Sequence, residues 1–199
     1  MTAVGYAIGV AYSFLLLAIT LTALVWLKEE APDGNVRVSV KRNHIKGRIL
    51  FEIQVSGLVH ATPQQTWAVL TDYERLPDFV PDLLSSKLLS RRGAQAVLEQ
   101  QGSVGFLFMR QVIHLVVRVT EQPFSTLDVA LVAGNMKHYA SHWELAPLDQ
   151  GGTRIAYRGS LEPDFFVPLL LGRVMVRADV QKMLAAVVAE VERRSIPAP

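Results

Sequence analysis

Residues 83–162 alternate between strand-like runs and short turn signals, and this pattern limits the fold more than any other feature of the chain. Within the runs, apolar and polar side chains alternate, as expected of strands with one buried face. The turns between the runs are short and contain hairpin-forming residues: Arg91-Arg92-Gly93, Gln122-Pro123, Gly134-Asn135 and Asp149-Gln150-Gly151-Gly152. Turns of this length join neighbouring antiparallel strands, so we expect an antiparallel meander.

Helical signals flank the meander on both sides. Before it, an alternating run over residues 49–59 predicts a strand, and Thr62-Pro63 with Gln65 forms a capping-box pattern that predicts a helix start. A second helical turn ends where Pro77 and Pro81 remove backbone donors. After the meander, apolar residues recur at three- and four-residue steps and predict a long helix to about Arg194: Val176, Val180, Met183, Val187 and Val191. The order of elements predicts an α+β fold.

The first 27 residues differ in kind from the rest. No charged side chain occurs from Ala3 to Leu27, and a helix of that length would reach about 37 Å, more than a bilayer core requires. We therefore expect a single-pass transmembrane anchor over residues 1–27, with a cleaved signal peptide as the alternative. Basic residues follow the segment and none precedes it, which favours a cytoplasmic domain over a periplasmic one.

The segment after the predicted anchor has the composition of a tether. Residues 28–47 combine the turn-forming Pro32-Asp33-Gly34-Asn35 with several basic side chains, and they contain one candidate short strand, Val36–Val40. The folded domain is then expected over residues 48–195. Half of all residues are hydrophobic, which is enough for one core of ordinary size.

Composition also removes several classes of function. The chain contains no cysteine, which excludes disulfides, thiolate metal sites and cysteine nucleophiles. The formal net charge is only +2, and Lys and Arg are scattered along the chain instead of forming one stripe. Binding of nucleic acid is therefore not expected.

Five segments together resemble a known superfamily. They are WAVLTDYERLPDFVP after the capped Thr-Pro, then VLEQQGSVGFLFMR, VTEQPFSTLD, HYASHWELAPLDQGGTRIAYRG and EPDFFVPLLLG. Over residues 50–194 the chain resembles the START-like superfamily, and more narrowly its polyketide cyclase/dehydrase and coenzyme-Q-binding branch. The resemblance implies a helix-grip fold, in which a curved antiparallel sheet wraps a long C-terminal helix and leaves an elongated cavity, with two short helices after the first strand closing one end.

Strand alternation separately predicts which side chains face that helix. The odd-numbered residues of the later strands are mostly apolar, so we expect them to point inward. The inward set includes four polar-tipped side chains: Tyr139, Ser141, Trp143 and Tyr157. Further candidates for ligand contact lie in the proline-rich break, before the last helix and on it: Phe79, Phe166, Met175 and Met183. Alternatively, the break is only a helix–helix corner and Phe79 is ordinary core.

The same alternation argues against acid–base or metal chemistry in the cavity. His114, His138 and His142 fall on even positions and are expected to point outward, and His138 and His142 would be about 13 Å apart along one strand. The alternation is broken only at Glu99, Gln100 and Gln101, which leaves their direction open. We expect no catalytic residue, no metal site and no cofactor, although a tyrosine that polarises a carbonyl keeps an enzyme possible.

An apolar lining with a few polar groups is typical of small-molecule pockets. We therefore expect membrane-tethered binding or transport of a hydrophobic small molecule, such as a lipid or isoprenoid quinone. A polyketide aromatase/cyclase-type enzyme is the first alternative, which an inward carboxylate or histidine would favour. The second alternative is a protein–protein module related to ribosome association. A filled cavity beside a basic outer face would favour it.

Overall fold

The computed structural model describes residues 36–45, 48–106, 109–165, 167 and 172–196. The predicted anchor over residues 1–27 and Phe166 lie outside these residues. Within them, no helix is both long enough and apolar enough to cross a membrane.

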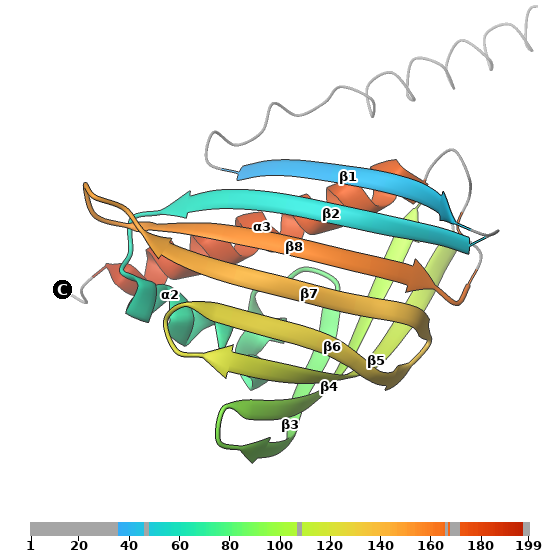
Figure 1. Ribbon diagram of the computed structural model, residues 1–199, viewed down its shortest axis with the longest axis horizontal. Helices are drawn as coiled ribbons and strands as arrows, with labels where there is room; N and C mark the ends of the chain where they lie inside the picture. Colours follow the sequence, from blue (N-terminus) through green and yellow to red (C-terminus); the bar gives the residue numbers. More distant parts are fainter. Residues whose placement is uncertain (1–35, 46–47, 107–108, 166, 168–171, 197–199) are drawn as a thin grey trace, which may run out of the picture. The chain divides into compact units, whose positions relative to one another are not determined.

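Eight strands form one antiparallel sheet in the order β1-β2-β8-β7-β6-β5-β4-β3 (Figure 1). The strands are β1 (Val36–Ile45), β2 (Arg48–Val59), β3 (Leu83–Arg92), β4 (Gln95–Phe106), β5 (Met109–Gln122), β6 (Thr126–Gly134), β7 (Met136–Pro147) and β8 (Thr153–Pro163). Helix α2 (Pro63–Leu70) and the 3-10 helix η1 (Tyr73–Asp78) connect β2 to β3, and α3 (Gly172–Ser195) follows β8. The curved sheet with α3 along one face is a helix-grip fold (Figure 1).

The start of α2 matches the capping pattern in the sequence. The Thr62 hydroxyl accepts a hydrogen bond from the Gln65 backbone N–H at 3.2 Å, and the Gln65 side-chain oxygen accepts one from the Thr62 backbone N–H at 2.9 Å. These bonds satisfy two donors that a helix start leaves free. The helix then buries Trp67, Val69 and Leu70. The second short helix is η1, which continues through Pro77 to Asp78.

The core lies between the inner face of the sheet and α3. Phe51, Ile53 and Ile155 from the sheet are at most 2% exposed, and they share this core with Leu184, Val187 and Val191 of α3. Burying a side chain of this size stabilises the fold by roughly 1.5–3 kcal/mol. Leu184 was not part of the predicted stripe, although it lies four residues after Val180 and three before Val187, and therefore on the same face of the helix.

The sheet starts earlier in the sequence than expected. β1 pairs with β2 along its whole length, from Val36 opposite Gly57 to Ile45 opposite Arg48, and Val36 and Val40 are buried. This segment was assigned to the tether, with only a short strand at Val36–Val40. Its alternation of polar and apolar residues is short and gives only a weak strand signal. The hydrogen bonds to β2 supply the stabilisation that the local sequence does not indicate.

One arginine side chain, that of Arg194, fixes the C-terminal end of α3 to the α2–η1 segment. Arg194 donates to Asp72 at 2.8 Å and to Glu190 at 2.6 Å, and its guanidinium lies 5.7 Å from the centre of the Phe79 ring. Hydrogen bonds from Arg193 lower the pKa of Glu190 to about 2, although burial acts in the opposite direction, and Arg194 adds to the lowering. Glu190 therefore stays ionised and keeps both arginines in place.

Candidate inner-wall binding site

Six residues from β7 and β8 form a continuous patch on the inner face of the sheet. Tyr139, Ser141 and Trp143 of β7 lie directly opposite Leu161, Gly159 and Tyr157 of β8. Directly opposed residues in an antiparallel pair share one face. We call these six residues the inner wall. Tyr157 is 4% exposed and Ser141 is 6% exposed, whereas Tyr139 and Trp143 are partly buried.

The absence of a side chain at Gly159 makes room for the Tyr157 phenol. A Cβ atom at this position would lie only 2.5 Å from Tyr157 Oη and 2.8 Å from its Cζ. The Tyr157 ring therefore leans along β8 across Gly159. It also meets the Trp143 ring edge-on, with ring centres 4.8 Å apart and an interplanar angle of 67°, a favourable aromatic geometry. These contacts fix where the phenol hydroxyl sits.

The Ser141 hydroxyl is buried and makes no hydrogen bond of good distance and angle to any described residue, although it lies close to the Tyr157 phenol. Next to it, burial raises the pKa of the Tyr157 phenol well above its ordinary value; Tyr139 adds to the rise and the Ser141 hydroxyl opposes it. Tyr157 is therefore neutral at any ordinary pH. The inner wall thus offers uncharged hydroxyl groups on an apolar surface, one of them with unused hydrogen-bonding capacity.

The remaining predicted contacts are more dispersed. Phe79 caps η1 and is partly buried, with Arg194 against its ring. Met175 and Met183 are partly buried on α3. That these side chains contact a ligand stays a prediction.

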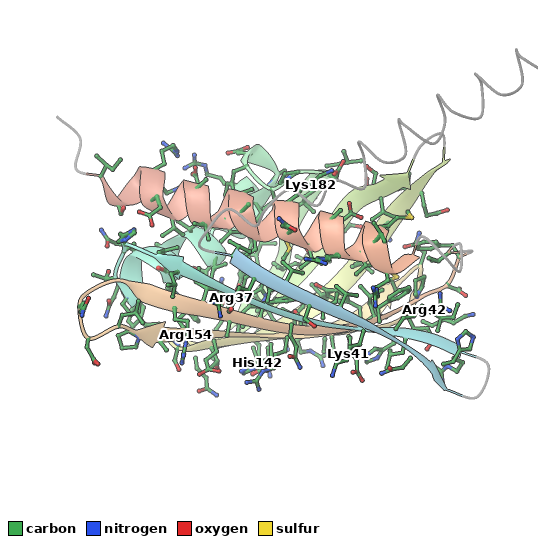
Figure 2. All side chains as sticks on the ribbon, turned by 90° about the horizontal axis from the view of Figure 1, so that it is seen from above. Arg37, Lys41, Arg42, His142, Arg154 and Lys182 are labelled. Atoms are coloured by element: carbon green, nitrogen blue, oxygen red, sulfur yellow. The ribbon has the colours of Figure 1, made fainter. Side chains whose placement is uncertain are left out.

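The histidines lie on the other side of the sheet. His142 contacts Asp128 at 2.7 Å, His138 contacts Ser160 at 2.8 Å, and Figure 2 shows His142 on the side away from α3. On β5, His114 contacts Glu99 at 3.0 Å, and both side chains are more than a third exposed. The described residues hold no group of three side chains placed to bind a metal ion.

The ambiguous residues of β4 divide between the two faces. Glu99 forms the outer pair with His114, whereas Gln100 lies opposite the buried Ser86 and donates to its hydroxyl at 3.2 Å. Gln100 is therefore a further polar group on the inner face.

One ionisable side chain on α3 was missed by the sequence reasoning. Burial raises the pKa of Asp179 to about 6; Lys182 opposes the rise and Asp82 adds to it. Asp179 lies three residues after Val176 and four before Met183, which places it beside the apolar stripe. This spacing was visible in the sequence and would have identified a carboxylate at the edge of the helix–sheet interface.

The fold and the inner wall define the class of protein: a helix-grip domain with an apolar, uncharged inner face. A family model described as polyketide cyclase/dehydrase and lipid transport matches residues 59–188, more than half of the chain, so the chain belongs to this family. A comparison with curated protein sequences gives no match.

Solved structures with the same fold come from distant relatives. A STAR-related lipid transfer protein from Xanthomonas axonopodis has a TM-score of 0.65 and 20% identity over 79% of this chain and 93% of its own. Human StAR-related lipid transfer protein 5 has a TM-score of 0.63 and 12% identity over 91% and 96%. The Zhui aromatase/cyclase from a Streptomyces species has a TM-score of 0.62 and 17% identity over 73% and 95%. At these identities the likeness establishes the fold.

Proposed function

We propose that this chain binds a hydrophobic small molecule, a lipid or an isoprenoid quinone, against the inner wall between the sheet and α3. The observation that carries the proposal is the buried Ser141 hydroxyl without a partner, next to the buried Tyr157 phenol. Leaving a buried hydroxyl unpaired costs about 1–3 kcal/mol, and such groups in native proteins call for an explanation. A carbonyl or hydroxyl group of a bound molecule would supply the missing partner.

The apolar surroundings define the rest of the ligand. Three apolar side chains adjoin these hydroxyls. Val55 of β2 lies opposite Tyr157, Val129 of β6 lies opposite Ser141, and Leu161 belongs to the inner wall. All three pack in the core. Such a surface favours a mainly hydrocarbon molecule with one polar group, because a second polar group would lose its hydration without compensation. The names of the structural relatives, two lipid transfer proteins and one aromatase/cyclase, support a ligand of this class.

The membrane anchor belongs to the same proposal. Residues 1–27 have the length and composition of a transmembrane helix. An anchored domain would receive an apolar ligand from the bilayer with little exposure of that ligand to water. The basic residues after the anchor favour the cytoplasmic side.

Native mass spectrometry of the full chain, purified from its host in a mild uncharged detergent, tests this function. We expect an apolar molecule to co-purify, and its occupancy to fall several-fold in Ser141→Ala and Tyr157→Phe. Ser160→Ala, at a neighbouring position of β8 that contacts His138 outside the inner wall, is the matched control and should keep the ligand. Ser141→Ala should also raise the stability of the ligand-free protein by about 1–2 kcal/mol, because it removes an unpaired buried hydroxyl. Equal occupancy in all variants would refute the assignment of the site.

Asp179 favours a second candidate function, the aromatase/cyclase reaction. With a pKa of about 6, its carboxylate would be ionised at pH 7 and still basic enough to accept a proton from a carbon next to a carbonyl. Ring closure of a linear poly-β-keto thioester by the wild-type chain, lost in Asp179→Asn, would support this reaction. Binding of the thioester without ring closure would support a binding protein instead.

A further inference from the structure

A hollow of about 320 Å³ lies on the outer face of the sheet, opposite to α3. It spans β1, β2 and β8. The side chains at its surface come from outward positions of these strands: Arg37, Ser39, Gln54, Ser56, Ala156 and Arg158. The side chains of Ala156, Ser56 and Ser39 are short, which creates the hollow. The longer side chains of Arg37, Gln54 and Arg158 form its border.

The two arginines of the hollow are available to a ligand. Among the described residues, neither Arg37 nor Arg158 forms an ion pair, and both are exposed. β2 alone separates their strands, and Arg37 and Arg158 are offset by two residues along it, so their Cα atoms are about 12 Å apart and both guanidinium groups can reach one ligand above β2. By contrast, Arg48 on the same face is engaged by Glu162 at 2.6 Å.

We propose that this hollow binds a compact phosphate-bearing molecule. Guanidinium groups bind phosphate through paired, charge-assisted hydrogen bonds, and the hydroxyls of Ser39 and Ser56 and the amide of Gln54 add neutral donors. Two carboxylates on the same face, Glu52 and Glu144, occupy positions diagonal to Arg158 and do not line the hollow. They repel an extended polyanion, which limits the ligand to a group that fits between the two arginines.

The phosphate has two possible sources: the headgroup of an anionic lipid or a soluble phosphate. Only residues 28–35 separate the predicted anchor from β1, and an extended chain of this length spans at most about 29 Å. An anionic bilayer surface would therefore be within reach of this face, and such surfaces attract nearby basic side chains. Figure 2 shows the basic side chain of Lys41 on the same side of the sheet.

Protection from the arginine reagent phenylglyoxal, read residue by residue by mass spectrometry on the full chain, tests the proposal. The chain is placed in an uncharged detergent with or without inorganic phosphate or glycerol 3-phosphate. It is also placed in nanodiscs of phosphatidylcholine with or without phosphatidylglycerol. We expect labelling of Arg37 and Arg158 to slow roughly tenfold with the ligand, and labelling of Arg154, on β8 outside the hollow, to change little. In Arg37→Ala the protection of Arg158 should be lost, because one guanidinium alone holds the phosphate weakly.

Each result decides the proposal. Protection by the two soluble phosphates assigns a soluble ligand, and protection only by phosphatidylglycerol assigns a lipid headgroup. No protection in any arm, equal protection of Arg154, or unchanged protection of Arg158 in Arg37→Ala would overturn it. Native mass spectrometry of the inner-wall ligand is independent of all these outcomes, since the two sites lie on opposite faces.

Discussion

The two faces of strands β7 and β8 carry opposite chemistry at adjacent positions. On the inner face, Tyr157, Ser141 and Trp143 are uncharged and largely removed from water. On the outer face, His142 and Arg158 lie directly opposite each other; Arg158 is exposed and His142 is partly exposed. Alternation along a strand separates these environments by a single residue. The difference shows that one strand pair can present both an apolar binding wall and a charged surface.

The physical reason for the separation is the cost of desolvating charge. On the outer face, exposed groups keep their hydration and need no partner, so charges accumulate there at little cost. On the inner face the sheet contributes neutral hydroxyls and an amide, and a titratable carboxylate, Asp179, comes from the flank of α3. Variants at positions on either side of the sheet test this contrast directly.

Gly159→Ala is expected to have the largest effect. The new Cβ would lie 2.5 Å from Tyr157 Oη, and the buried ring has little room to move. Overpacking of this kind costs about 2–3 kcal/mol, and displacement of the phenol should also reduce ligand occupancy. Denaturant unfolding measures the first effect, and native mass spectrometry measures the second.

Ser160→Ala is the matched control for this change, because Ser160 is the next residue and points to the outer face. It should cost less than about 1 kcal/mol. Combining Gly159→Ala with Tyr157→Phe removes the nearest clashing atom and should recover part of the lost stability. Strictly additive costs would mean that Gly159 does not make room for the phenol.

Much of this arrangement follows from local sequence patterns. The strand alternation, the Thr62–Gln65 cap and the stripe of α3 are set by neighbouring residues. The structure agrees with the first two, and on α3 it buries Val187 and Val191 and leaves the rest of the predicted stripe partly buried. The alternation places Tyr157 and Ser141 on the buried face and His142 on the exposed one.

The remaining features depend on which strands pair and in which register. Trp143 meets the Tyr157 ring only because β8 passes opposite β7, and the arginines of the hollow come from strands far apart in sequence. The position of Asp179 beside the apolar stripe was visible in the sequence, but the proximity of Asp82, which adds to the rise of its pKa, depends on the tertiary fold. β1 was underestimated for the same reason, since its pairing with β2 is a tertiary effect.

Asp179→Asn should have a smaller effect that depends on pH. A carboxyl group whose pKa is raised from 3.8 to about 6 in the folded protein holds its proton more tightly there than in the unfolded chain. The contribution of Asp179 to wild-type stability therefore falls as pH rises from about 4 to 6. The asparagine variant lacks this loss and should be more stable by about 1 kcal/mol at pH 7.5, after allowance for solvent screening.

Unfolding curves between pH 4 and pH 7.5 measure this difference. Asp128→Asn, on the exposed outer face, serves as the control and should show no comparable gain at pH 7.5. A constant difference between Asp179→Asn and wild type at every pH would mean that Asp179 does not titrate in this range.

His142→Ala is expected to have the smallest effect. Its hydrogen-bonded contact with Asp128 is exposed, with 37% of the histidine side chain and 53% of the aspartate side chain accessible, so its loss should cost less than about 0.5 kcal/mol. Ligand occupancy should not change, because His142 and Trp143 point to opposite faces of β7. Adding Asp128→Asn in a double-mutant cycle should give a coupling energy of similar size. A marked fall in ligand occupancy in His142→Ala would show that the outer face takes part in binding the apolar molecule, and the contrast between the two faces would then be wrong.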